Sequence, residues 1–271
     1  MIYHEMMTSF QKTVWQFYND HGRSFPWRHI ENPYYVMVSE IMLQQTQTDR
    51  VIAKYEEFIT QFSDIFSLAR ASLHDVLSAW QGLGYNRRGK FLQQCAQQIV
   101  QKYGGIVPEK FEHLIALPGI GKATAGSIPA FAYNMPTIFI ETNIRAVFIY
   151  HFFGSMQEVH DGDIEPLVAA TLDQENPREW YYALMDYGVF LKKQHKNPNR
   201  KSAHYTRQSA FEGSDRQIRG AIIRFLTKKG TIAIQELLEQ FQEPAERVTR
   251  IIADLAHEQL IVKKNEMLEI P

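Results

Sequence analysis

The most informative short segment of this chain is Leu117-Pro118-Gly119-Ile120-Gly121, followed by Lys122-Ala123-Thr124-Ala125-Gly126. Two glycines on either side of one apolar residue let the backbone turn sharply and approach another surface closely. The helix predicted after this turn begins with backbone N–H groups that have no partner inside the helix. Such a helix start favours an anionic group, for example a phosphate. The stretch therefore predicts a hairpin between two helices that can hold an anion.

On both sides of this hairpin the sequence predicts helices. Most of residues 8–191 shows apolar residues at spacings of three and four, interrupted by turn residues, as in the run from Val36 to Phe62. Alternation typical of strands is clear only near the C-terminus, where residues 259–270 offer two short apolar runs around a Lys-Asn turn. We therefore predict an all-α main domain and a C-terminal β-hairpin.

A second, smaller unit is predicted from Ser214 onward. Three short helical segments precede the C-terminal hairpin, an order typical of a winged helix, which is an α+β fold. Its third helix, at about residues 244–259, would present Arg247 and Arg250 to a DNA groove. Winged helices also serve as protein-interaction modules, so both interpretations stay open. The predicted domains are residues 1–191, a basic linker at 192–213, and 214–271.

Composition fits a globular protein without a strong overall charge. The chain has 271 residues, 45% of them hydrophobic, and a formal net charge of -1, which gives no support to a nucleic-acid partner. The N-terminus lacks the basic start and apolar core of a signal peptide, so we expect a cytoplasmic protein. The one cysteine, Cys95, excludes an internal disulfide and any four-thiolate metal site built by this chain alone.

One local stretch is strongly basic. It combines eight lysines and arginines with only Glu212 and Asp215: Lys192, Lys193, Lys196, Arg200, Lys201, Arg207, Arg216 and Arg219. A basic segment of this kind suits contact with phosphates. A solvated linker whose charge only keeps it soluble is the alternative.

Two further blocks precede the hairpin in the chain. They are Asn32-Pro33-Tyr34-Tyr35-Val36-Met37-Val38-Ser39-Glu40-Ile41-Met42-Leu43-Gln44-Gln45-Thr46-Gln47 and Trp80-Gln81-Gly82-Leu83-Gly84-Tyr85. In this order and spacing, the three blocks closely resemble the helix-hairpin-helix DNA glycosylases of the MutY and endonuclease III superfamily. The resemblance covers roughly residues 25–190 and favours the MutY branch, because SEIMLQQTQ is typical of that branch. It implies a two-lobed helical glycosylase fold and a DNA-repair function.

The resemblance assigns the chemistry to two acidic residues. Cleavage of an N-glycosidic bond needs a proton for the departing base and negative charge near the sugar cation. Glu40 corresponds to the general acid of the family, and partial burial would raise its pKa. Glu141 stands where the family has an aspartate, and one added methylene can move a carboxylate by about an ångström. We expect Glu141 to replace that aspartate in a reshaped pocket, with Asn143 orienting it or capping the next helix; a protein that binds lesions but cleaves them poorly is the rival.

The same comparison predicts the residues that contact DNA. Gln45 and Tyr85 correspond to residues that enter the duplex beside an extruded nucleotide, although Tyr85 could instead pack within its turn. Arg28 belongs to a segment similar to the family's Pro-Trp-Arg element. The remaining predicted DNA contacts are Gln44, Thr46, Arg88, Leu117, Gly119, Gly121, Lys122, Ala123 and Thr124.

Three departures from the family narrow the expected activity. Bifunctional relatives carry a lysine nucleophile at the position of Ala123, so we expect a monofunctional glycosylase without lyase activity. The four cluster cysteines of the relatives are missing after Met185-Asp186-Tyr187-Gly188, so no iron-sulfur cluster and no other cofactor is expected. A monovalent cation at the backbone of Leu117 and Ile120 is the one ion that the resemblance suggests. The domain that reads oxidised guanine in MutY is replaced by the winged-helix pattern.

Together these features predict a monofunctional DNA glycosylase of base excision repair that removes adenine or another purine from a mispair or lesion in duplex DNA. We expect a monomer associated with the nucleoid. The alternatives are a thymine or uracil mismatch glycosylase, which needs no acid for a purine nitrogen, and a catalytically weak lesion-binding protein.

Overall fold

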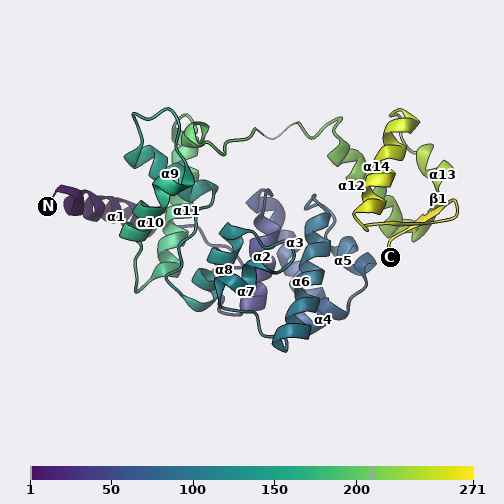
Figure 1. The fold of residues 1–271 in the computed structure, drawn as a ribbon, viewed down its shortest axis with the longest axis horizontal. Coiled ribbons are helices and arrows are strands. Elements are labelled where there is room, and N and C mark those ends of the chain that lie inside the picture. The colour runs from purple at the N-terminus through teal and green to yellow at the C-terminus, as the bar shows by residue number, and fades with distance from the viewer. Residues whose placement is uncertain (1, 208–209) are drawn as a thin grey trace. The chain divides into compact units, whose positions relative to one another are not determined.

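The computed structural model describes residues 2–207 and 210–271 as a mostly helical protein with one small sheet (Figure 1). By their contacts, the residues fall into two units. Unit 1 comprises Met1–Val36, Glu109–Ile115 and Ile120–Arg207, and unit 2 comprises Met37–Pro108, Ala116–Gly119 and Gln208–Pro271. The prediction of a helical main domain followed by a small α+β domain is confirmed.

The helices of the main domain follow the turn residues of the sequence. Their bounds are α1 Ile2–His21, α2 Pro33–Leu43, α3 Thr48–Gln61, α4 Ile65–Arg70, α5 Leu73–Ala79, α6 Arg87–Tyr103, α7 Phe111–Ile115, α8 Lys122–Tyr133, α9 Thr142–Phe152, α10 Asp161–Thr171 and α11 Pro177–Gln194, followed by the short 3-10 helix η1 Pro198–Lys201. Caps fix several of these ends. Asp64 accepts a hydrogen bond from the backbone N–H of Ser67 at the start of α4, and Gly104 ends α6 in the left-handed conformation.

The core of unit 1 lies where α9 and α11 pack together, with α1 against α11. Trp180 and Tyr181 of α11 and Phe148 of α9 are fully buried in it. Gly188 allows the close approach of the two helices, because a Cβ atom there would lie 2.4 Å from the carbonyl oxygen of Asn143. Large aromatic side chains of α9 and α11 therefore pack together in this core.

The C-terminal part of unit 2 has the order expected for a winged helix. It consists of α12 Asp215–Lys229, β1 Thr231–Ala233, α13 Ile234–Leu238, α14 Ala245–His257, β2 Val262–Lys264 and β3 Met267–Glu269. The strands form an antiparallel sheet in the order β1-β3-β2, and the β2-β3 hairpin is the one predicted around the Lys-Asn turn. One face of α14 is apolar and packs into the core through the buried side chains of Val248, Ile251 and Leu255.

This small domain shares its core with the main domain. Leu73 and Leu77 of α5 belong to the same buried cluster as Ile218 and Ile222 of α12. The contacts therefore group the C-terminal domain with part of the main domain in unit 2, whereas the sequence pattern suggested a boundary at Ser214. The beginning of the basic segment, up to Arg207, belongs instead to unit 1.

Over the described residues, no helix combines the length and the apolar composition needed to cross a membrane.

Candidate active site

The glycine turn lies between α7 and α8, as the sequence predicted. Gly119 has a φ of 76°, in the left-handed region that favours glycine, and a Cβ atom there would lie 2.8 Å from the Cβ of Phe91. Gly121 is the N-cap of α8 and brings no side chain to the helix start. Lys122 is exposed beside it, whereas Thr124 is buried. An anion can therefore approach the start of α8 without displacing a capping side chain.

Glu141 is the N-cap of α9, and its carboxylate is held by the start of that helix. Oε1 accepts hydrogen bonds from the backbone N–H groups of Asn143 at 2.6 Å and Ile144 at 2.9 Å. Oε2 accepts a hydrogen bond from Nδ2 of Asn143 at 3.1 Å. Three donors therefore fix the position of this carboxylate. A solvated glutamate would lack these three hydrogen bonds.

The surroundings of Asn143 hold the same helix start. Its Oδ1 atom is buried and has no hydrogen-bond partner among the described residues. Gly188 of α11 packs directly against the backbone of Asn143. On the other side, Nδ2 of Asn199 in η1 donates to the carbonyl oxygen of Thr142 at 2.9 Å. Part of the basic segment thus supports the N-terminus of α9 instead of acting as a free linker.

The electrostatics at Glu141 combine burial with nearby positive charge. Burial raises the pKa of Glu141 above its ordinary value, while the N–H groups of Ile144 and Asn143 and the charge of Lys192 oppose this rise. Burial in turn lowers the pKa of Lys192, and Glu141 opposes that change. Sequence reasoning placed Lys192 only in the basic segment. The sequence did offer one signal that Lys192 lies near Glu141. Lys192 follows Gly188 by four residues, and residues i and i+4 lie on the same face of a helix.

Glu40 lies near the C-terminus of α2 and is half-buried, beside the fully buried Met37 and Ile41. This partial burial agrees with what the sequence predicted for the residue. Glu40 belongs to unit 2 and Glu141 to unit 1.

The segments that carry Gln45 and Tyr85 have strained backbones. Gln45 has a φ of 55° and Tyr85 a φ of 48°, which are unusual values for residues with a side chain. Gln45 is exposed and Tyr85 is half-buried. Gln44 is turned inward instead, and its Nε2 donates to the carbonyl oxygen of Gly119 at 3.3 Å. The structure thus brings Gln44, one of the predicted DNA contacts, against the glycine turn within unit 2.

Arg88 connects these two segments from inside the protein. Its side chain is buried, and Nη1 and Nη2 donate to six acceptors, namely the carbonyl oxygens of Ile41, Met42, Gln44, Leu83 and Gly84 and the hydroxyl of Thr46. Burial lowers the pKa of Arg88 to about 10. The prediction that Arg88 contacts DNA is therefore corrected, because its guanidinium group caps the C-terminal end of α2.

Arg28 requires the same correction. Its side chain is 3% exposed, and Nη1 and Nη2 donate to both oxygens of Asp186 at 2.8 and 2.7 Å. Arg23 donates to the same carboxylate from Nε at 2.8 Å. Burial would raise the pKa of Asp186, but the hydrogen bond and the charge of Arg28 lower it overall. Arg28 thus ties the segment after α1 to α11 within unit 1.

The two basic residues expected on the exposed face of α14 are paired within the domain. Arg247 donates from Nε to Asp215 Oδ1 at 2.9 Å, and Arg250 donates from Nη2 to Asp215 Oδ2 at 2.6 Å. These bonds hold the pKa of Asp215 below its ordinary value. The pairing reduces the positive charge that α14 offers to a DNA groove.

A family of known proteins matches the part of the chain that carries Glu40, the glycine turn and Glu141. Residues 38–162 match the family model described as HhH-GPD superfamily base excision DNA repair protein. The chain is 36% identical over 187 residues to an adenine DNA glycosylase of Buchnera aphidicola subsp. Baizongia pistaciae, covering 67% of this chain and 52% of that protein. It is 31% identical over 229 residues to an adenine DNA glycosylase of Mycobacterium tuberculosis, covering 77% of this chain and 75% of that protein. The chain thus spans about half the length of the first relative.

Solved structures share the fold at lower sequence identity. A thermostable thymine-DNA glycosylase matches with a TM-score of 0.65 and 21% identity, covering 74% of this chain and 94% of that chain. A non-covalent endonuclease III–DNA complex matches with a TM-score of 0.57 and 15% identity, covering 70% of this chain and 86% of that chain. At these identities the similarity concerns the fold alone.

Proposed function

Because the chain belongs to the HhH-GPD superfamily of base excision DNA repair proteins, we propose that it is a DNA glycosylase that hydrolyses the N-glycosidic bond of a purine in duplex DNA. Adenine in a mispair or opposite a damaged base is the favoured substrate. The similarity to adenine DNA glycosylases from two bacteria supports this choice.

The observation that carries the proposal is the fixed carboxylate of Glu141. When an N-glycosidic bond breaks, the sugar gains positive charge, and a preorganised negative charge stabilises that state. Glu141 supplies such a charge, because two backbone N–H groups and Asn143 hold it in one position. Glu40, half-buried on α2, is proposed as the acid that protonates the departing purine.

The proposed enzyme is monofunctional and uses water. A lyase needs an amine that attacks the sugar and forms a Schiff base. Ala123, at the position of that amine in bifunctional relatives, carries only a methyl group. Failure to trap a covalent DNA complex with borohydride is the expected result, and a trapped complex would contradict this part of the proposal.

Duplex DNA is the proposed partner, and the enzyme is proposed to act as a monomer in the cytoplasm, at the nucleoid. The open start of α8 beside the exposed Lys122 supports contact with a backbone phosphate. A monovalent cation at the carbonyl groups of Leu117 and Ile120 would assist that contact. No other cofactor is proposed.

A panel of duplexes, each with one mispaired or modified base, tests the substrate. Released bases are scored as alkali-labile sites with the wild-type protein. We expect release of adenine from the A:G mispair and from the duplex in which adenine lies opposite oxidised guanine. Cleavage only at thymine or uracil would favour the mismatch glycosylase, and binding without cleavage of any duplex would favour a lesion-binding protein.

A further inference from the structure

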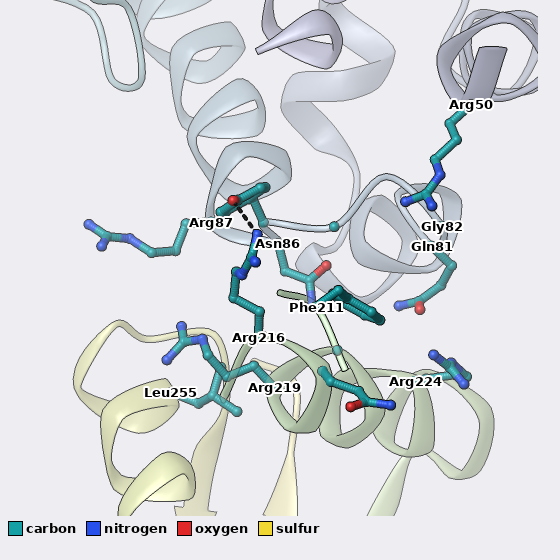
Figure 2. Close-up of a pocket in the computed structure, with 14 residues that line it drawn as sticks. Arg50, Gln81, Gly82, Asn86, Arg87, Phe211, Arg216, Arg219, Arg224 and Leu255 are labelled. Atoms are coloured by element: carbon teal, nitrogen blue, oxygen red, sulfur yellow. Dashed lines mark hydrogen bonds between the residues drawn. The ribbon is translucent and has the colours of Figure 1, made fainter. Parts of the chain in front are cut away.

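Unit 2 contains a pocket of about 280 Å³ whose lining is unusually basic. Five of the fourteen lining residues are arginines and none is acidic: Arg50, Arg87, Arg216, Arg219 and Arg224. Figure 2 shows Arg50 reaching in from α3, and Arg216, Arg219 and Arg224 extending from α12. All fourteen residues belong to unit 2. We call this site the arginine pocket.

One carboxylate neutralises part of the charge, on one side of the arginine pocket. Glu258 forms an ion pair with Arg219 and lies 3.7 Å from Nε of Arg87. Arg50 and Arg224 form no ion pair among the residues that the structure describes, and both are exposed. These two arginines therefore keep their charge available for an anion from outside.

Two aromatic rings complete the arginine pocket. The hydroxyl of Tyr85 accepts a hydrogen bond from Nη1 of Arg216 at 2.6 Å, drawn as a dashed line in Figure 2. The guanidinium carbon of Arg216 also lies 5.5 Å from the centre of the Tyr85 ring. Phe211 lines the pocket with 58% of its surface exposed. An exposed aromatic ring therefore lies beside the arginines.

Positive side chains combined with accessible aromatic rings are the features with which proteins hold unstacked nucleotides. Arginines bind the phosphate, and bases stack on aromatic rings whatever their sequence. The volume of the arginine pocket lies just below the range of about 300–1,000 Å³ that is typical of small-molecule sites, so it suits a single nucleotide.

We propose that the arginine pocket holds one unstacked nucleotide of a DNA strand, with its phosphate on Arg50 and Arg224 and its base against Phe211 and Tyr85. This inference rests on the proposed function, because it assumes a DNA substrate. It assigns the DNA contact of the C-terminal domain to α12, whereas the sequence pattern suggested α14. The pairing of Arg247 and Arg250 with Asp215 supports this assignment.

The test measures the affinity for a fluorescent duplex with one A:G mispair over a series of salt concentrations. The double variant Arg50→Gln/Arg224→Gln should bind at least about tenfold more weakly. The slope of log affinity against log salt should become less steep by about 0.9, because the two arginines hold one phosphate and each phosphate contact contributes about 0.9. Both side chains are exposed and form no ion pair among the described residues, so thermal unfolding should be unchanged.

Two controls identify the surface. Arg70→Gln removes an exposed arginine of unit 2 outside the arginine pocket and should leave the slope unchanged. Arg247→Gln/Arg250→Gln tests α14 and should also leave it unchanged. The proposal is overturned if the pocket variant keeps the wild-type slope, or if the α14 variant alone reduces it.

A separate variant tests the stacked base. Phe211→Ala should weaken binding about tenfold without changing the salt slope, because stacking involves no counterion release. Wild-type affinity in Phe211→Ala would overturn the assignment of the base. The binding assay does not depend on catalysis. If the pocket variants bind as expected but the wild-type protein releases no base, the proposed function fails and this inference stands. If the wild-type protein releases a base but the pocket variant keeps the wild-type salt slope, this inference fails and the proposed function stands. Absence of wild-type binding to the duplex would overturn both.

Discussion

The charge of Glu141 can be removed almost without changing the shape of the side chain, by the substitution Glu141→Gln. The amide oxygen of glutamine can replace Oε1, so the backbone N–H groups of Asn143 and Ile144 keep their acceptor. The new amide nitrogen would then face Nδ2 of Asn143, which now donates to Oε2 at 3.1 Å. Rotation of the Asn143 amide relieves this conflict, because its Oδ1 has no partner among the described residues.

The magnitudes separate a structural effect from a catalytic one. Keeping the two backbone hydrogen bonds should limit the loss of unfolding free energy to about 1 kcal/mol. The lost attraction between a carboxylate and a sugar cation is about 4 kcal/mol at about 4 Å and an effective dielectric constant of about 20. Since about 1.4 kcal/mol corresponds to a factor of ten in rate, base release should slow by about a thousandfold.

The assay is single-turnover base release from the best duplex of the panel, together with thermal unfolding of each protein. Glu165→Gln is the matched control, because Glu165 is an exposed glutamate on α10 of the same unit. It should leave both measurements unchanged. Base release by Glu141→Gln within a few-fold of wild type would refute the electrostatic role. A loss of activity that only follows a large loss of stability would show that Glu141 acts as a helix cap alone.

Two further predictions follow from charged groups whose roles the structure reveals. The substitution Lys192→Gln removes a positive charge and should raise the pKa of Glu141 further, so the acid limb of the pH-rate profile of base release moves to higher pH. The control Lys193→Gln, on the exposed side of α11, should leave the acid limb in place, and identical pH-rate profiles in the two variants would contradict the role of Lys192. Arg88→Met should lower the unfolding free energy by about 3 kcal/mol or more, because it removes the buried donor of six hydrogen bonds. Arg87→Met at an exposed position should change it by about 0.5 kcal/mol or less in chemical denaturation, and equal losses in the two variants would count against this role of Arg88.

Local patterns were sufficient to predict most of the fold. Apolar spacing gave the helices, and the glycine turn at Gly119 and Gly121 is found between α7 and α8. The Lys-Asn turn at Asn265 lies between β2 and β3. These features depend on residues close together in the sequence, so a single sequence contains the information. The cap of α9 was less certain, because the sequence offered Asn143 as the capping residue, whereas Glu141 is the N-cap and Asn143 lies inside the helix.

The roles of the arginines depended on partners far away in the chain. Arg28 pairs with Asp186, which is 158 residues distant, and Arg247 pairs with Asp215, which is 32 residues distant. Sequence alone shows an arginine and not whether a carboxylate will reach it, so both residues were predicted to face DNA. The arginine pocket was missed for the same reason, because α3, α6 and α12 supply its charges from distant parts of the sequence.

The guanidinium group of Arg88 has a consequence for how such a protein can diversify. It donates hydrogen bonds to the carbonyl oxygens of Gln44, Leu83 and Gly84 at once, so the segments that carry Gln45 and Tyr85 are held together. These acceptors are backbone atoms, so the hydrogen bonds do not depend on the side chains at positions 45 and 85. Substitutions at positions 45 and 85 should therefore change the proposed contact with the DNA duplex and leave the backbone that carries these two residues in place.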